Sequence, residues 1–328
     1  MNRSSWARIA DRLSPAVSAA CRIARWGLAA LFVTLASGST TVEAATLGVA
    51  MIPPVAFTQL LHDQIAEHAK FRGMAVEFAY APEGAGEQQI AQIRGFISAK
   101  VDALVVMPVD AAANATITRL AQEADIPLVY INNGPREDWF SGRVAFVLPN
   151  DLVAGRLQMR KLAQMLEGVG SVAILSGHPT HFGSVLRTQG VKEVMHEFPH
   201  LRLAAEAAAD WDRAKAHAIV AAWLKQGIAI SAIAANNDEM ALGAAEAVEA
   251  AGIPAGRILI GGVDAIPDAI AAMQEKRLAV TIHQDPAIQA GQAVDDALAL
   301  IRHQPIQQYD WAPFELVTER MSTAHFAQ

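Results

Sequence analysis

Short apolar runs alternate with longer amphipathic stretches along most of the chain. In the segment 57–73, for example, Leu60, Leu61 and Ile65 fall on one face of a helix, and Gly73 follows as a stop signal. The same spacing predicts further helices at 87–100 and 114–125. Apolar runs between these segments predict strands at 46–51, 75–80, 102–108, 126–132 and 142–150.

The same alternation restarts after residue 150. Helices are predicted at 151–168, 183–199, 212–227, 237–252 and 286–304, and strands at 171–177, 201–208, 230–235, 258–264 and 278–285. Repeated strand–helix units predict parallel sheets covered by helices on both faces. About ten such units are too many for one ordinary sheet. The pattern therefore predicts an α/β fold with two doubly wound parallel-sheet domains.

The first 44 residues follow a different pattern. Five arginines precede the apolar run WGLAALFVTLA (26–36), and Val42 and Ala44 occupy the small-residue positions of a cleavage site. This order is typical of a secretory signal peptide that is removed after Ala44, and it predicts a secreted protein. An uncleaved anchor helix is the alternative, although the apolar run is short for a membrane span.

Composition narrows the range of functions. The chain has 328 residues, of which 52% are hydrophobic and 18% charged, enough for a large core and two domains. Loss of residues 1–44 removes five arginines and two acidic residues, which moves the net charge from −7 to −10. An acidic chain repels phosphate backbones, so nucleic acid is not expected as a partner.

The sequence offers little support for catalysis. Cys21 is the only cysteine and lies in the signal segment, so the mature chain is expected to have no disulfide and no cysteine nucleophile. No G-x-S-x-G elbow is present. His178 and His181 have a metal-like spacing but no accompanying ligand motif, which favours loop histidines near a cleft. We therefore expect neither enzymatic activity nor a metal or cofactor.

Polar residues gather where the predicted strands end. Ligands of open α/β sheets bind outside the carboxyl ends of the strands, so a ligand cleft is expected at this edge. Asn237 is predicted to face the ligand, and Asp238 to be the N-cap of the helix that follows. The residues at these strand ends are Asn132, Asn133, Asn237, Asp238, Asp264 and Gln284.

Four segments carry a resemblance to a known family. They resemble the ribose-type branch of the type I periplasmic sugar-binding proteins, which serve ABC transporters, and the resemblance covers about residues 46–320. The segments are NNDEMALGAAEAVEAAG (236–252), GGVDAIPDAIAAM (261–273), LAVTIHQDPAIQAGQAVDDAL (278–298) and FELVTER (314–320).

The resemblance also implies how the chain is divided. It implies two domains joined by three hinge segments, near 148–151, 284–286 and 311–314. The N-terminal lobe would then comprise 45–149 and 285–312, and the C-terminal lobe 150–284 and 313–328.

The resemblance further implies a set of binding residues. Arg187 would grip sugar hydroxyls, Trp211 would stack on the sugar ring, and Asn237, Asp264 and Gln284 would be polar ligands. Substitution of Arg187 or Asp264 by alanine is then expected to weaken binding and leave the fold intact.

The first domain departs from the family pattern. Residues of lower polarity replace several of the family's polar ligands there, so we expect a ligand with one less polar edge, such as a pentose, a deoxy sugar or a short polyol. The first-domain candidates are Pro54, Phe57, Met107, Asn132 and Asn133.

These features predict a monomeric periplasmic solute-binding protein. It would capture a small sugar or polyol in an interdomain cleft and deliver it to the permease of an ABC importer. The alternative is a periplasmic sensor of the same fold that acts with a membrane receptor or histidine kinase. A transcription factor is not expected, because the N-terminal segment carries the signal pattern instead of a helix-turn-helix.

Overall fold

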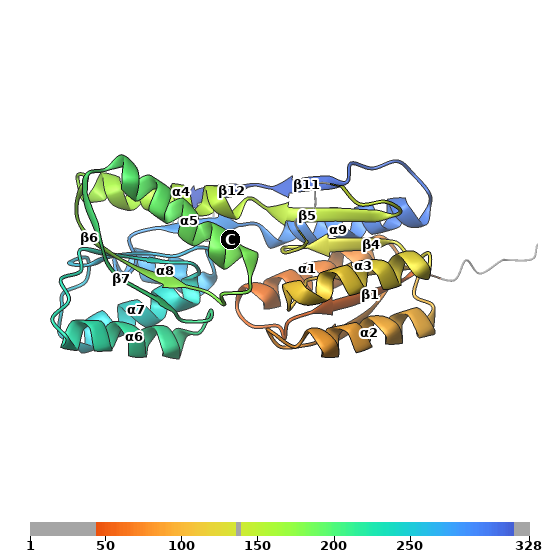
Figure 1. Ribbon diagram of the computed structural model, residues 1–328, viewed down its shortest axis with the longest axis horizontal. Coiled ribbons are helices and arrows are strands. Elements are labelled where there is room, and N and C mark those ends of the chain that lie inside the picture. Colours follow the sequence, from red (N-terminus) through yellow and green to blue (C-terminus); the bar gives the residue numbers. More distant parts are fainter. Residues whose placement is uncertain (1–43, 136–138, 318–328) are drawn as a thin grey trace, which may run out of the picture. The chain divides into compact units, whose positions relative to one another are not determined.

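The computed structural model describes residues 44–135 and 139–317, and the predicted signal peptide lies outside the described residues. A first sheet of six parallel strands has the order β11-β5-β4-β3-β1-β2. Figure 1 shows that its strands come from both ends of the described chain. They are β1 (Thr46–Met51), β2 (Ala75–Tyr80), β3 (Ala103–Val106), β4 (Leu128–Ile131), β5 (Val144–Pro149) and β11 (Tyr309–Ala312).

Helices cover both faces of this first sheet. On one face α1 (Phe57–Phe71) and α9 (Pro286–Ile301) pack together, and their apolar side chains share a cluster with Val49, Val105 and Val129. On the other face α2 (Gly86–Ala99) and α3 (Asn114–Glu123) pack on Leu104 and Tyr130, and a short 3-10 helix, η1 (Ala111–Ala113), precedes α3. Alternate strand residues point to opposite faces, which explains why both faces are apolar.

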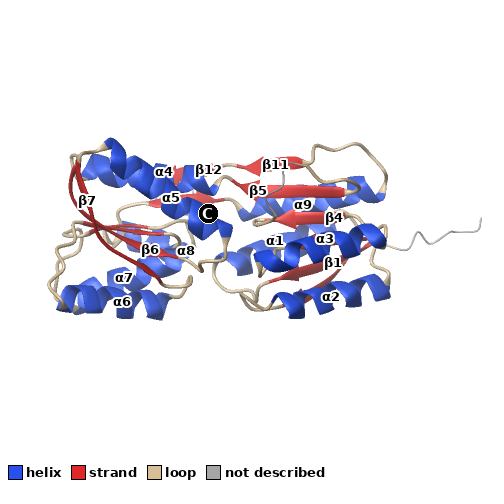
Figure 2. Ribbon diagram, viewed as in Figure 1, coloured by secondary structure: helices blue, strands red, loops and turns tan. Residues whose placement is uncertain are grey.

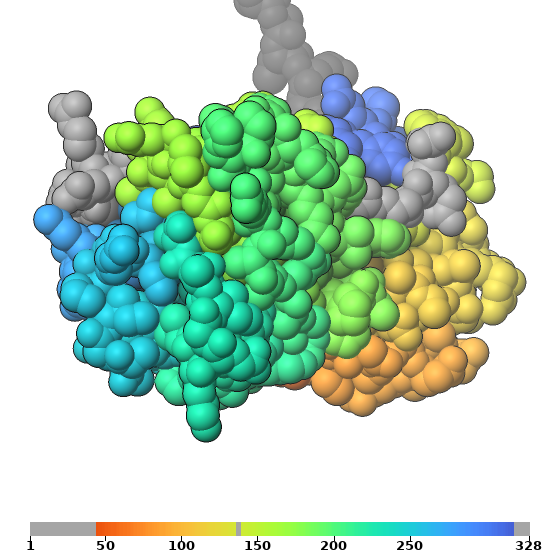
Figure 3. Space-filling view, turned by 60° about the vertical axis from the view of Figure 1, so that its left-hand side comes forward, coloured from red at the N-terminus to blue at the C-terminus, as the bar shows by residue number. Residues whose placement is uncertain are grey.

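A second sheet of four parallel strands has the order β7-β6-β8-β9. Its strands are β6 (Val169–Ser176), β7 (His200–Ala208), β8 (Ala232–Ala235) and β9 (Leu259–Gly261). One face carries α4 (Asp151–Met165) and α5 (Phe182–Glu197), and the other α6 (Arg213–Lys225), α7 (Asp238–Ala250) and α8 (Pro267–Gln274). Figure 2 shows the alternation of strands and helices, and in Figure 3 the α5 to α6 segments form the surface nearest the viewer.

A short antiparallel pair, β10 (Thr281–Gln284) with β12 (Phe314–Val317), completes the described chain. Three segments join the sheets: 149–151 leads from β5 to α4, 284–286 from β10 to α9, and 312–314 from β11 to β12. We call β1–β5, α1–α3, η1, α9 and β11 the first lobe, and the remaining elements the second lobe. The fold class predicted from the sequence is thus confirmed.

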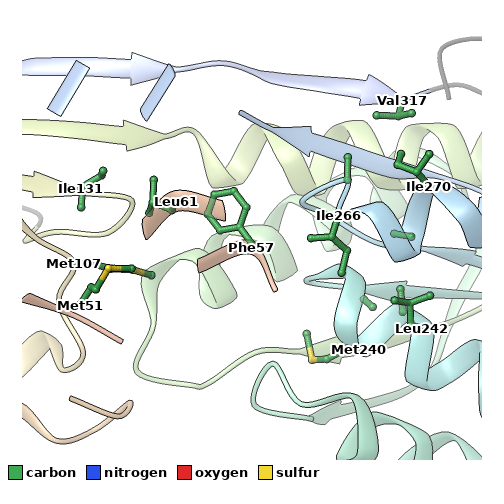
Figure 4. Close-up of a cluster of buried hydrophobic side chains, with 14 of the residues drawn as sticks. Met51, Phe57, Leu61, Met107, Ile131, Met240, Leu242, Ile266, Ile270 and Val317 are labelled. Atoms are coloured by element: carbon green, nitrogen blue, oxygen red, sulfur yellow. The ribbon is translucent and has the colours of Figure 1, made fainter. Parts of the chain in front are cut away.

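One cluster of buried apolar side chains extends from the first lobe to the second. In Figure 4 Phe57 lies between Leu61 of its own helix and Ile266 of the second lobe. Phe57 is 6% exposed and Ile266 4%. The loop after β1 is therefore packed against the second lobe, and it ends beside the cavity described below.

A buried carboxyl group lies where α9 packs on β11, and it predicts a pH effect on stability. Gln292 Nε2 donates to Asp296 Oδ1 (3.2 Å) and to Asp310 Oδ2 (2.8 Å). Burial, and then the charge of Asp310, raises the pKa of Asp296 to about 7. The folded protein thus binds this proton more tightly than the unfolded chain, so the stability contributed by Asp296 is lost as the pH rises from about 4 to 7.

We expect the free energy of unfolding of Asp296→Asn, relative to that of the wild type, to rise as the pH increases from about 4 to 7. Above about pH 7 the difference between the two proteins should stay constant. Urea unfolding at pH 4, 5.5, 7 and 8.5 measures this difference. Glu249→Gln, at an exposed position of α7, is the control for loss of one carboxylate. A difference that does not vary with pH would contradict the assignment.

Candidate functional site

A cavity of about 320 Å³ lies between the two lobes, and both sheets contribute the loops at their carboxyl ends. This is the edge at which ligands of open α/β sheets bind. The cavity is lined by Ile52, Pro53, Val55, Ala56, Phe57, Thr58, Pro82, Glu83, Met107, Asn132, His181, Arg187, Asp210, Trp211, Asn237, Glu239, Asp264 and Gln284.

Arg187 is the best-anchored polar side chain of the cavity. It lies on α5, is 5% exposed, and its Nε donates to Asp151 Oδ1 at 2.8 Å. Its Nη1 donates to the backbone oxygen of Asn236 at 2.7 Å and lies 3.5 Å from Asp264 Oδ1, and its Nη2 donates to Gln284 Oε1 at 3.3 Å. The guanidinium is therefore held in one orientation before any ligand arrives, which lowers the entropic cost of binding.

Asp264 combines an anchored position with an unusual pKa. Its Oδ1 accepts from Gln284 Nε2 at 3.4 Å. Burial raises the pKa of Asp264 to about 7, although the charge of Arg187 opposes this rise. Near neutral pH its carboxyl group can therefore either accept or donate a hydrogen bond, as a hydroxyl-bearing ligand requires.

The structure corrects the predicted roles of Asn237 and Asp238. Asn237 is the N-cap of α7, because its Oδ1 accepts from the backbone N–H of Met240 at 3.0 Å. Asp238 is the first residue of the helix and is fully buried. It accepts from Thr281 Oγ1 (2.7 Å) and from the N–H of Ile266 (3.0 Å), which ties α7 to β10 and to the start of α8. Asn237 lines the cavity as well, so one side chain serves both the cap and the cavity wall.

Trp211 forms an aromatic wall of the cavity. Its ring meets His181 edge-on at 5.1 Å between centroids, and Arg187 Cζ lies 5.9 Å from the ring centroid. A Cβ atom at Gly177 would come within 2.2 Å of the Trp211 ring, so the absence of a side chain there allows the indole to lie where it does. Trp211 is half-buried.

The two histidines of the loop before α5 differ in role. The Nδ1 atom of His181 accepts from the N–H of Gly183 at 3.1 Å, so His181 is the N-cap of α5. Burial, and then the charge of Arg187, lowers the pKa of His181 to about 3, so the ring is neutral at physiological pH. His178 instead contacts Thr180 on the surface. Within residues 44–135 and 139–317, no three metal-ligating side chains come together in a way that could hold an ion.

Left-handed backbone conformations gather at the cavity. Five non-glycine residues that line it have φ between 47° and 119°: Ala56, Asn132, Asp210, Trp211 and Asp264. Most other residues of this kind, such as Lys100, Glu167 and Lys276, lie at helix C-termini, where the conformation is common. Sparsely populated backbone conformations cluster at binding sites, where the surrounding fold holds them.

Eight of the ten side chains predicted from the sequence line this cavity: Arg187, Trp211, Asn237, Asp264, Gln284, Phe57, Asn132 and Met107. Two do not. The neighbouring Pro53 lines the cavity in place of Pro54, and Asn133 turns away to accept from the N–H of Gly134 at 3.0 Å. The first-lobe wall is also less uniformly apolar than expected, because Thr58 and Glu83 belong to it.

Asn133 lines a larger cavity of about 510 Å³, to which the segment 149–151 also contributes, with Leu148, Phe182 and Trp311 among its other lining residues. Asp151 is the one charged residue there among those that the structure describes, and its side chain is bound to Arg187. We therefore place the functional site in the smaller cavity, where several fixed polar groups converge.

Comparison with known proteins agrees with this geometry. The family model described as the periplasmic binding protein domain matches residues 50–305. This chain belongs to the periplasmic binding protein family. The resemblance to the ribose-type branch of the type I periplasmic sugar-binding proteins is thereby confirmed. Among the described residues, no helix has the length and apolar character needed to cross a membrane.

Relatives within the family share most of the chain. A putative rhizopine-binding protein of Rhizobium meliloti is 35% identical over 286 residues, covering 86% of this chain and 92% of that protein. The ribose import binding protein of Bacillus subtilis is 29% identical and covers 78% of this chain and 81% of its own. An ABC transporter solute binding protein from Bacillus halodurans, solved with bound myo-inositol, has a TM-score of 0.81 at 32% identity and covers 88% of this chain and 99% of that one.

Proposed function

We propose that this protein binds a small sugar or polyol in the cavity between its lobes and delivers it to the permease of an ABC importer. The observation that carries the proposal is the anchored set of Arg187, Asp264 and Gln284, which offers fixed donors and acceptors side by side. Each hydroxyl of a polyol both donates and accepts, so such a set can satisfy several hydroxyls at once.

The apolar part of the cavity wall suits the remaining face of such a ligand. Phe57 and Met107 from the first lobe, and Trp211 from the second, present apolar surfaces to the cavity. An aromatic face packs well against the C–H groups of a sugar or cyclitol ring. We propose Arg187, Trp211, Asn237, Asp264, Gln284, Phe57, Asn132 and Met107 as the ligand-contacting residues.

Family membership bears on the rest of the functional assignment. The family consists of periplasmic binding proteins, which implies a periplasmic location, and relatives such as the ribose import binding protein support a transporter as the partner. We further propose that the protein acts as a monomer, without catalytic activity and without nucleic acid as a partner. Names such as ribose import binding protein favour import over a sensing role among its relatives.

Ligand screening tests the proposed function directly. Mature protein is mixed with myo-inositol, D-ribose, D-allose and xylitol, and the unfolding temperature and the heat of binding are measured. We expect at least one compound to raise the unfolding temperature, because a ligand at about 100 times its Kd stabilises the native state by about 2.7 kcal/mol. Absence of binding to any sugar or polyol in a broader screen would contradict the proposal.

The division of the chain at Ala44 remains a prediction. We expect periplasmic extracts to contain a polypeptide that begins at Ala45, because the basic lead, the apolar run and the V-E-A site have the order of a cleaved signal. Intact-mass analysis of the purified protein measures this. A mass that corresponds to the full 328 residues would contradict it.

A further inference from the structure

Glu83 is a carboxylate of the cavity without a protein partner. It lies in the loop between β2 and α2, is half-buried, and forms no hydrogen bond or ion pair among the described residues. The other carboxylates of the cavity are paired: Asp210 with Lys215, Glu239 with Arg213 at 2.7 Å, and Asp264 with Arg187. Glu83 is therefore the carboxylate left to be paired by a ligand.

The surroundings of Glu83 make an unpaired charge costly. Pro53, Pro82 and Met107 also line the cavity, and Asp110 is the charged group whose charge acts on Glu83. Burial, and then the charge of Asp110, raises the pKa of Glu83 to about 7. A carboxylate that is partly withdrawn from water and has no protein partner gains more from a donor on the ligand than a carboxylate that is already paired.

The charge balance of the cavity favours a positive partner. Arg187 is the single permanent cation among its lining residues, and Asp151 and Asp264 already offset that charge. His181 is neutral at physiological pH. A carboxylate or phosphate on the ligand would therefore find no uncompensated cation, whereas a cation would find Glu83.

We propose that the cavity selects a polyol or sugar that carries an amino group, with the ammonium paired to Glu83 and the hydroxyls held by Arg187, Asp264 and Gln284. This inference rests on the proposed function. Charge-assisted hydrogen bonds are about twice as strong as neutral ones, and the partly desolvated cavity strengthens the attraction. The second lobe then recognises the hydroxylated face, and the first lobe recognises the charge.

Binding of the ammonium is linked to a proton. Below about pH 7 Glu83 is partly protonated, so a cationic ligand must displace that proton, and its affinity rises as the pH increases towards 7. Asp110, Asp210, Glu239 and Asp264 are the other acidic groups that face this part of the site. The contribution of Glu83 is isolated by comparing the wild type with Glu83→Gln.

Matched ligand pairs test the proposal. Calorimetry is performed with myo-inositol and a monoamino-inositol, and with D-glucose, D-glucosamine and D-glucuronate. We expect the amino compound of at least one pair to bind about 10- to 100-fold more tightly than its neutral partner, and glucuronate to bind most weakly. Glu83→Gln is expected to remove that preference, so that the ratio of the amino to the neutral affinity falls towards about 1. Glu87→Gln, exposed in the first turn of α2, is the matched control.

Proton release gives an independent measurement. At pH 6 the amino ligand is expected to release protons on binding to the wild type, seen as a dependence of the heat on buffer ionisation, and to release fewer on binding to Glu83→Gln. Neutral compounds that bind as tightly as their amino partners, or a preference that survives in Glu83→Gln, would overturn the inference but leave the proposed function intact. Failure of every compound to bind would count against both.

Discussion

Arg187→Ala is expected to abolish detectable ligand binding and also to destabilise the protein by about 3–5 kcal/mol. The guanidinium is 5% exposed and is shared by Asp151, Asp264, Gln284 and the backbone of Asn236. Its removal takes the cation away from two buried carboxylates, which is far costlier than loss of a surface pair. The sequence-based expectation that the fold would be unaffected is therefore revised by the burial of this residue.

A neighbouring arginine provides the control. Arg156 on α4 bridges to Glu193 on α5 at 2.6 Å, so it joins the same two helices as the Asp151–Arg187 pair, but both side chains are partly exposed. Arg156→Ala is expected to cost at most about 1 kcal/mol and to leave ligand affinity unchanged. Urea unfolding and calorimetry on both variants measure the contrast. Equal losses of stability in the two variants would show that the buried Arg187 network contributes no more than the partly exposed Arg156–Glu193 pair.

Gly155→Ala is expected to destabilise the protein by about 3 kcal/mol, although alanine usually stabilises a helix. Gly155 lies where α4 crosses α5, and an added Cβ would come within 2.0 Å of the backbone oxygen of Arg187. Backbone cannot rotate away as a side chain can, so the helices must separate. Because Arg187 is the residue that moves, ligand affinity should fall together with stability.

Gly95→Ala is the matched control for this substitution. Gly95 is an exposed residue of α2, and an added Cβ there meets no atom within 4 Å. This variant is expected to gain about 0.5–1 kcal/mol, because alanine restricts the unfolded chain and favours the helix. A Gly155→Ala protein with unchanged stability and affinity would show that the helix crossing tolerates separation.

The apolar periodicity was sufficient to predict the architecture, because the inner strands β1, β3, β4, β5 and β8 are buried apolar runs. It did not predict β11 and β12, which read YDWA and FELV and are only partly buried. Each is defined by pairing with a strand distant in the sequence, β5 and β10 respectively. Such long-range pairing leaves little signal in four residues.

The candidate site was predicted where its residues lie one to three positions after a buried strand, as Asn132, Asn237 and Asp264 do. It was missed where a loop decides the direction of a side chain. Pro53 and Pro54 are indistinguishable by type, and the conformation of the loop selects Pro53. Glu83 follows an edge strand in a polar segment, so nothing in its local sequence separates it from surface residues such as Glu87. Asp238 is held in its buried position, away from the predicted cap, in part by a hydrogen bond from Thr281, more than 40 residues away.

The position of α9 and β11 in the first lobe has a consequence for the order in which the chain folds. The second sheet is complete once residue 261 has been made, and it is formed from one continuous stretch. The first sheet begins at residue 46, but its last strand, β11, is made only when synthesis reaches residue 312. The helix α9, which packs on β3, β4 and β5, is also made late, between residues 286 and 301. The lobe that is synthesised first is therefore completed last, and its apolar strands stay partly uncovered during synthesis and export, when unfinished sheets are most prone to aggregate.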